Sequence, residues 1–190
     1  MIVHLVGSLR NLDDDVKNLN AIVNVVHDHG ATIAHNWLEA AIVRRKNKIY
    51  IKDWTPFVQH NMDALQHSDV VIIDATHYAF SHGYQMAAAL HHQKPVLVVS
   101  RDRLKYKYIT GFTNNLLSYK TYTSEDDLSQ IVSLFLKKNT IHTKDLRFNI
   151  MLTKKISRYL DEKSQETGKN KSEIIRDIIK KHDKMRKNNG

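Results

Sequence analysis

Two stretches decide the fold: Ser68-Asp69-Val70-Val71-Ile72-Ile73-Asp74 and Pro95-Val96-Leu97-Val98-Val99-Ser100. Both are short runs of aliphatic residues without polar alternation, which is typical of strands that are buried on both faces of a sheet. Residues 83–92 lie between them and have a helical pattern. A strand, a helix and a second buried strand in this order predict a parallel βαβ unit.

The same alternation extends over the first 140 residues. We expect the acidic run 13–15 to cap the first helix, a proline at residue 56 to lie in the first turn of the third, and residues 124–127 to form a capping box. The pattern predicts an α/β fold with a doubly wound, Rossmann-like parallel sheet of about five strands, which places ligands at the carboxyl ends of its strands. The remaining expected strands are 2–6, 31–34 and the edge strand 118–122, and the remaining helices are 13–28, 37–45, 56–66 and 124–137.

Composition narrows the possible classes of protein. The chain has 190 residues, 42% of them hydrophobic, a net charge of +9 and no cysteine. The absence of cysteine excludes disulfides, thiolate metal sites and cysteine nucleophiles. The apolar runs are too short for a membrane span, and the first residues do not resemble a signal peptide. We therefore expect a cytoplasmic protein without a membrane partner.

The positive charge is concentrated near the end of the chain. Residues 144–190 hold 14 Lys and Arg against 7 Asp and Glu, whereas residues 1–143 hold 15 against 13. A basic tail on a nearly neutral first part is typical of a chain whose tail meets a polyanion, although a solvated tail that serves solubility has the same composition. We predict a first domain over 1–138, a polar linker over 139–146 and a second domain over 147–190.

The second domain has a pattern of its own. Residues 147–152 alternate, with Phe148, Ile150 and Leu152 on one face. Two helices should follow, one capped by Thr153 and ended at Gly168, the other capped by Asn170. A strand and two helices of this length cannot bury their apolar residues alone, so we expect the domain to dimerise or dock.

This β-α-α segment resembles the ribbon-helix-helix family of DNA-binding proteins over about residues 146–184. The resemblance implies that two chains pair their strands into a ribbon that enters the major groove of double-stranded DNA. Arg and Asn on the outward face suit guanine and adenine, and the start of the second helix suits a phosphate. The alternative is that this segment only dimerises, or that it binds a protein partner as an antitoxin does. The expected DNA-binding residues are Arg147, Asn149, Met151, Lys154, Lys155, Lys169, Lys171 and Ser172.

The first domain resembles the nucleoside 2-deoxyribosyltransferase-like superfamily, which includes deoxynucleoside 5′-monophosphate N-glycosidases. The resemblance is carried by residues 3–10, by residues 68–74 with 83–90, and by residues 94–97. It implies that Gly7, Ser8 and Arg10 help to hold a nucleotide, because a glycine turn exposes backbone amides and an arginine grips an anion. Taken alone, a Gly-Ser turn is more often ordinary turn chemistry.

The departures from that family concern its catalytic groups. The resemblance places the family's nucleophilic Glu on Gln85 and its second carboxylate on Asn61. An amide is a poor nucleophile and does not shuttle protons. The family's first-strand Tyr corresponds to His4, and its phosphate-binding Ser to Ala79. We therefore identify no catalytic residue, and keep Asp63, Asp74 and His4 as substitutes for the missing carboxylates.

Further candidates for ligand binding follow the third strand. Asp74 suits a ribose hydroxyl, and several histidines suit an anion when they are cationic. Tyr78 and Phe80 offer faces for a base, although core packing explains such residues as well. The sequence shows no metal-ligand spacing, and we expect no metal and no cofactor. With Gly7, Ser8, Arg10, Asp74 and Gln85, the expected ligand-binding set includes His77, His82, Gly83 and Tyr84.

These observations favour a DNA-binding transcriptional regulator. Its first domain would be an inactive, nucleotide-sensing pseudoenzyme that takes a nucleoside- or nucleotide-like small molecule, and its tail would bind DNA. A homo-oligomer, dimer or tetramer, is expected because both resembled families are dimeric. The alternative is an active N-glycosidase or deoxyribosyltransferase on nucleosides or nucleotides, targeted or self-regulated through its DNA-binding tail.

Overall fold

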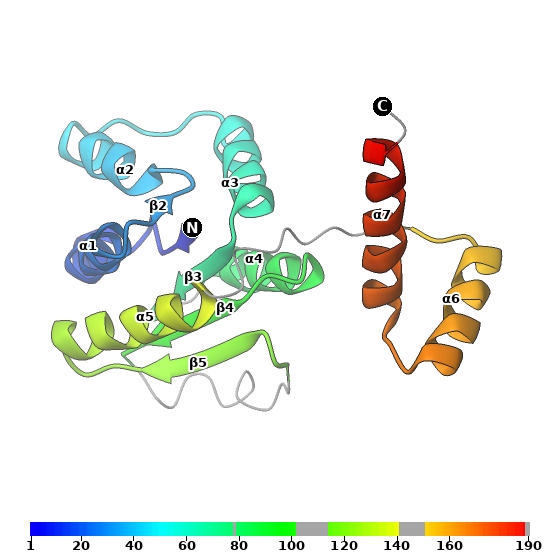
Figure 1. Cartoon of the computed structure of the whole chain (residues 1–190). Helices are drawn as coiled ribbons and strands as arrows, with labels where there is room; N and C mark the ends of the chain where they lie inside the picture. Colours follow the sequence, from blue (N-terminus) through cyan, green and yellow to red (C-terminus); the bar gives the residue numbers. More distant parts are fainter. Residues whose placement is uncertain (78, 102–113, 141–150, 189–190) are drawn as a thin grey trace. The chain divides into compact units, whose positions relative to one another are not determined.

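The computed structural model describes residues 1–77, 79–101, 114–140 and 151–188 (Figure 1). The chain separates into two compact units, residues 1–145 and residues 146–190. Arg147 and Asn149 lie outside the described residues, as does Tyr78. We describe each unit by itself.

The first unit contains a five-stranded, fully parallel sheet with the strand order β2-β1-β3-β4-β5. The central strands β1, β3 and β4 are buried apart from Ile2 at the start of β1, whereas the two edge strands, β2 and β5, are half-buried or exposed along their length. The prediction of an α/β fold with about five parallel strands is confirmed. The strands are β1 (Ile2–Val6), β2 (Thr32–Ile33), β3 (Val70–Asp74), β4 (Val96–Ser100) and β5 (Leu117–Thr121).

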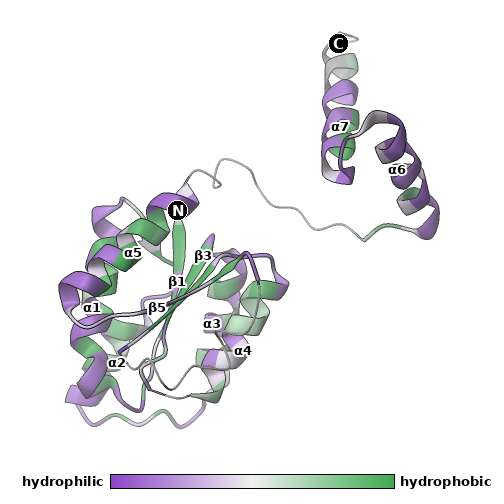
Figure 2. Cartoon of the chain, turned by 90° about the horizontal axis from the view of Figure 1, so that it is seen from below, coloured by the Kyte–Doolittle hydropathy of each residue, from purple (hydrophilic) through white to green (hydrophobic). Residues whose placement is uncertain are grey.

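Helices cover both faces of this sheet (Figure 2). Alternate residues of each buried strand supply two separate cores, one against α1, α2 and α5 and the other against α3 and α4. Val70 and Ile72 belong to the first core, whereas Val71 and Ile73 belong to the second. The helices are α1 (Leu12–Asp28), α2 (Trp37–Lys46), α3 (Thr55–His67), α4 (Phe80–His91) and α5 (Glu125–Thr140).

Three helix ends differ from expectation. The N-cap of α1 is Asn11, and the acidic run 13–15 lies inside the first turn, where it still favours the helix dipole. Helix α4 begins at Phe80, three residues early, because Gly83 does not interrupt the helix. Helix α5 continues to Thr140, since the Asn139 side chain donates to the carbonyl oxygen of Phe135 and is buried. The first two residues of the predicted linker are therefore helical.

The second unit contains α6 (Lys154–Thr167) and α7 (Lys171–Asn188). Thr153 caps α6 by accepting a hydrogen bond from the backbone of Ile156, and Gly168 ends it in the left-handed conformation at φ 67°. Asn170 and Glu173 form reciprocal side-chain to backbone bonds at the start of α7. These three helix signals are confirmed. The predicted strand falls mostly outside the described residues.

The apolar face of the second unit is only partly covered. Leu160 and Ile174 are buried between the two helices. Four other apolar side chains on these helices are 47–63% exposed: Ile156, Tyr159, Ile178 and Ile179. Within the described segments of the chain, no helix has both the length and the hydropathy to cross a membrane.

Candidate functional site

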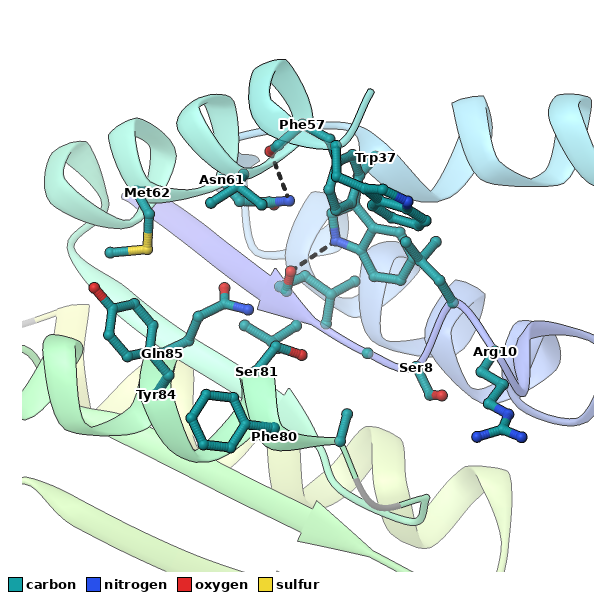
Figure 3. Close-up of a pocket in the computed structure, with 17 residues that line it drawn as sticks. Ser8, Arg10, Trp37, Phe57, Asn61, Met62, Phe80, Ser81, Tyr84 and Gln85 are labelled. Carbon is teal, nitrogen blue, oxygen red and sulfur yellow. Dashed lines mark hydrogen bonds between the residues drawn. The ribbon is translucent and has the colours of Figure 1, made fainter. Parts of the chain in front are cut away.

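A pocket of about 570 Å³ opens at the carboxyl ends of β1 and β3 (Figure 3). This is the place where the strand order reverses, since β2 lies on one side of β1 and β3 on the other. Residues 5–10 form one wall, α2 and α3 form a second, and the first turns of α4 form the third. The lining is therefore assembled from segments that are far apart in the sequence.

Gly7 turns the chain out of β1 and into the pocket wall. A Cβ atom at this position would lie 2.8 Å from Cδ2 of Leu19 and 3.2 Å from the Trp37 ring, so close packing explains the glycine. The Trp37 indole donates a 2.7 Å hydrogen bond to the carbonyl oxygen of Leu5, which holds the ring against the pocket. The glycine thus allows the Trp37 ring to pack beside the end of β1.

Ser8 and Arg10 have different roles in the same turn. The Ser8 side chain is buried, and its oxygen accepts a 3.2 Å hydrogen bond from the backbone of Asn11, which stabilises the start of α1. Arg10 has no hydrogen bond or ion pair with any residue that the structure describes. It is the only cationic side chain among the described lining residues, and none of them is Asp or Glu.

Asn61 and Gln85 lie in the lining of the same pocket, on α3 and α4. The Asn61 amide donates to the Phe57 carbonyl oxygen at 3.1 Å, and its oxygen lies 3.3 Å from Nδ1 of His35. The Gln85 oxygen lies 2.8 Å from Nε2 of His4. Two side-chain amides therefore occupy the positions that the family resemblance assigns to carboxylates.

His4 lies beneath the pocket and does not line it. Its side chain is fully buried in β1, and burial lowers its pKa. Its Nδ1 atom has no hydrogen-bond partner among the described residues. His4 is therefore a neutral imidazole at pH 7, and its hydrogen bond to Gln85 connects it to the pocket lining.

Asp74 ends β3 in a buried polar network away from the pocket lining. One carboxylate oxygen accepts hydrogen bonds from the backbone and hydroxyl of Thr76, at 2.9 and 2.6 Å. The other accepts a 3.1 Å bond from the Tyr122 hydroxyl, whose pKa is raised by burial. Both oxygens of Asp74 are therefore engaged within the fold.

Asp15 lies in a second group of charges near the same strand ends. Its oxygens are 2.7 Å from Nδ1 of His77 and 2.6 Å from the Arg101 guanidinium. Burial raises the pKa of the Asp15 carboxyl. His77 is thus held by a hydrogen bond to Asp15 and lies outside the pocket lining.

Three other expected site residues also lie outside the lining. His82 is buried in the first turn of α4, where burial lowers its pKa and the backbone of Gly7 opposes that shift. Gly83 has open space around its Cα, and Asp63 is exposed on α3. The structure therefore brings Gly7, Ser8, Arg10, Asn61, Phe80, Tyr84 and Gln85 together at the pocket. His4, Asp63, Asp74, His77, His82 and Gly83 lie outside its lining.

Aromatic side chains form much of the lining, and the sequence did not predict most of them as pocket residues. Tyr84 and Phe80 were expected, and Phe80 is 94% exposed at the pocket. The other three are Trp37, Trp54 and Phe57, the last two meeting edge to face at 5.7 Å between ring centroids. No signal in the sequence marks these three, because only the tertiary fold places α2 and α3 beside the end of β1.

Of the expected DNA-binding residues, the six that the structure describes are exposed or paired at the surface. Lys154, Lys155 and Ser172 are exposed. Lys169 pairs with Asp177 at 2.7 Å, and Lys171 pairs with Asp161 at 2.6 Å. Met151 is almost fully exposed. Exposed ion pairs of this kind are weak, so both lysines remain available to another anion.

The described residues contain no group of three or more His, Asp or Glu side chains that fits a metal ion.

Comparison with known proteins gives a likeness in structure and none in sequence. No family model matches the chain, and no curated protein matches it. Among solved structures, the CMP N-glycosidase BcmB of Clostridium botulinum aligns with a TM-score of 0.53 and 16% sequence identity. The alignment covers 72% of this chain and 100% of BcmB.

The likeness is one of fold. It supports the resemblance of the first unit to the nucleoside 2-deoxyribosyltransferase-like fold, with a five-stranded parallel sheet and flanking helices. At 16% identity it carries no residue role from BcmB to this chain.

Proposed function

We propose that the first unit binds a nucleotide-like ligand without cleaving it, and that the second unit binds DNA, so that the chain is a ligand-responsive DNA-binding regulator. The observation that carries the first half is the composition of the pocket: two amides, one unpaired arginine, five aromatic rings and no carboxylate among the described lining residues. A flat aromatic group that carries an anion fits these walls.

The dimensions of the pocket support a small-molecule ligand. A volume of about 570 Å³ is within the usual range for ligand pockets. Aromatic side chains stack on a base, and Arg10 supplies a two-pronged donor for a phosphate. The fold neighbour BcmB is described as an N-glycosidase of CMP, which is a ligand of this class.

The missing carboxylates argue against glycosidic cleavage. Hydrolysis of a glycosidic bond usually requires two carboxyl groups, one beside the anomeric carbon and one that transfers a proton. Gln85 and Asn61 supply neither function. The buried carboxylates of Asp15 and Asp74 are held by other partners, away from the lining.

The test combines binding with product analysis. Purified protein is titrated calorimetrically with nucleoside 5′-monophosphates, and the same mixtures are examined chromatographically for free base. We expect binding without base release, and a loss of about tenfold or more in affinity for Arg10→Gln, because a charged hydrogen bond is removed. The matched control is Arg45→Gln, which removes a surface arginine paired with Asp13. Absence of binding contradicts the proposal, and release of base supports the active-enzyme alternative.

The proposal for the second unit rests on charge and on its uncovered apolar face. Residues 144–190 carry a net charge of +7. The exposed Ile156, Tyr159, Ile178 and Ile179 form a surface that a second copy of the same unit would bury. A symmetric dimer matches a palindromic DNA site.

The DNA-binding half has its own test. Electrophoretic mobility shifts on the DNA upstream of the protein's own coding sequence should show binding at low salt. Lys171→Ala should weaken binding to all sequences and lower the salt slope by about 1, because one phosphate contact is lost. Arg147→Ala and Asn149→Ala should instead relax the sequence preference. Absence of binding at low salt, with a protein that co-purifies from the native host, supports the protein-gripping alternative.

A further inference from the structure

A hydrogen bond that the proposed function does not explain joins β1 to the pocket lining. His4 is fully buried in the middle of β1, opposite Val71 in the sheet register. Its Nε2 atom lies 2.8 Å from Oε1 of Gln85 on α4. Figure 3 shows the Gln85 amide extending from its helix toward Asn61 on the far wall. The contact therefore links a buried ring to a group that lines the pocket.

The chemistry of the two atoms determines which ring nitrogen of His4 carries the hydrogen. The amide oxygen of Gln85 only accepts hydrogen bonds, so Nε2 of His4 carries the hydrogen and donates it. Burial lowers the pKa of His4, the hydrogen bond to Gln85 opposes this shift, and the electrostatic effects of His35 and Lys94 add to it. His4 is therefore neutral near pH 7, with its hydrogen on Nε2 and a bare Nδ1.

The reverse arrangement is less favourable. If the Gln85 amide were turned over, its nitrogen would donate to Nε2, and the His4 hydrogen would move to Nδ1. That nitrogen is buried and has no partner among the described residues. An unpaired buried donor is disfavoured, and fewer such donors than acceptors occur in folded proteins. The surroundings of His4 thus select one orientation of the amide.

We propose that His4 is a positioning residue that holds the Gln85 amide with its nitrogen directed toward the pocket, where it donates a hydrogen bond to an oxygen atom or ring nitrogen of the ligand. The Gln85 nitrogen has no partner among the residues that the structure describes. The pocket then offers donors from both Gln85 and Arg10. The part of this inference that concerns the ligand rests on the proposed nucleotide binding.

Nitrogen-15 NMR of the wild-type, ligand-free protein tests the positioning role directly. Long-range spectra of the imidazole rings distinguish a neutral ring protonated on Nε2 from one protonated on Nδ1. We expect His4 to be neutral and protonated on Nε2 at pH 7. A ring protonated on Nδ1, or a cationic ring, would overturn the assignment, whether or not any nucleotide binds.

Four variants test the effect on the ligand, with the nucleoside 5′-monophosphate that the wild-type protein binds most tightly as the probe. Gln85→Met removes the donor at similar size, and we expect about a threefold to tenfold loss of affinity. Gln85→Glu replaces the donor by an anion, and the loss should be larger. His4→Phe keeps a ring but releases the amide, and His4→Gln keeps a donor that restores part of the affinity.

The outcomes separate the two proposals. Equal affinity of the wild-type protein, Gln85→Met and His4→Phe for the nucleotide would refute the inference while leaving the proposed function intact. Absence of binding by the wild-type protein would refute the proposed function, and the NMR spectrum would still decide the orientation of the amide. Because His4 is buried, thermal unfolding of each variant is measured first, and the NMR result holds even if His4→Phe does not fold.

Discussion

The pocket and the polar network behind it contain opposite sets of side chains. The pocket has amides, aromatic rings and one unpaired arginine, and its described lining has no carboxylate. The network, in which the backbone of Arg101 donates to the Thr76 hydroxyl, has two buried carboxylates, Asp15 and Asp74, and each is held by at least two partners. Both regions lie near the carboxyl ends of the same parallel strands.

This difference shows that the buried carboxylates of Asp15 and Asp74 stabilise the fold and do not line the pocket. A buried carboxylate is tolerated when hydrogen bonds or charges compensate for its lost hydration, and both acids of the network meet this condition. The same hydrogen bonds and ion pairs occupy their oxygens. In this fold the acidic groups therefore support the strand ends, whereas the pocket presents hydrogen-bond donors and apolar walls to a ligand.

The largest expected effect comes from removing an acid of the network. Asp74→Ala leaves the Tyr122 hydroxyl and the Thr76 hydroxyl without their buried acceptor. We expect the free energy of unfolding to fall by about 3–5 kcal/mol, measured by denaturant titration. Asp63→Ala, at an exposed position on α3, is the control and should change it by less than about 0.5 kcal/mol. Equal effects at the two positions would contradict the structural role of Asp74.

The buried histidines predict a pH dependence of the first unit. Burial lowers the pKa of both His4 and His82 in the folded protein below the ordinary value of 6.5. Below about pH 6.5 the unfolded chain therefore binds more protons than the folded chain, and the free energy of unfolding falls as the pH drops. Each histidine contributes a slope of up to about 1.4 kcal/mol per pH unit until its folded pKa is reached.

Denaturant titrations between pH 5 and pH 8 measure this slope. His82→Leu should flatten it, whereas His91→Gln, an exposed position at the end of α4, should leave it unchanged. If the slope of His82→Leu matched that of the wild-type protein, the pKa of His82 would not be lowered by folding.

The sequence predicted the sheet better than the pocket. Each buried strand reads as a continuous aliphatic run, and residues 70–74 and 96–100 formed strands within one residue of expectation. The loop residues Gly7, Ser8 and Arg10 were found because they directly follow a strand. Trp37 and Phe57 were not, since their place at the pocket depends on how α2 and α3 pack against β1.

Position in the sequence also did not predict which polar side chains line the pocket. Asp74 and His77 follow β3 closely, and proximity to a strand end suggested the site. Their side chains instead face Tyr122 and Asp15, which come from segments 48 and 62 residues away in the sequence. Such long-range partners have no local signature. In the second unit, by contrast, Thr153, Gly168 and Asn170 act within one helical turn, and their roles were predictable.

A smaller effect is expected when a carboxylate is placed in the pocket. Asn61→Asp loses the 3.1 Å bond that its amide donates to the Phe57 carbonyl oxygen. We expect a destabilisation of about 0.5–1.5 kcal/mol by denaturant titration, well below the effect of Asp74→Ala. The pocket is open to water, so the new charge keeps most of its hydration. A loss as large as that of Asp74→Ala would show that the pocket depends on its amides for stability.

The smallest effect on stability, and a specific effect on binding, is expected at the pocket entrance. Phe80 lines the pocket and is 94% exposed, so it contributes little to the core. We expect Phe80→Ala to change the free energy of unfolding by less than about 0.5 kcal/mol. If the ring stacks on a base, the same variant should weaken nucleotide binding by about 1–3 kcal/mol, measured by calorimetry. Tyr50→Ala is the matched control, because Tyr50 is 86% exposed and lies outside the lining of this pocket. A loss of affinity at Phe80 with none at Tyr50 would place the base against α4, whereas equal affinities would leave stacking to the walls formed by α2 and α3.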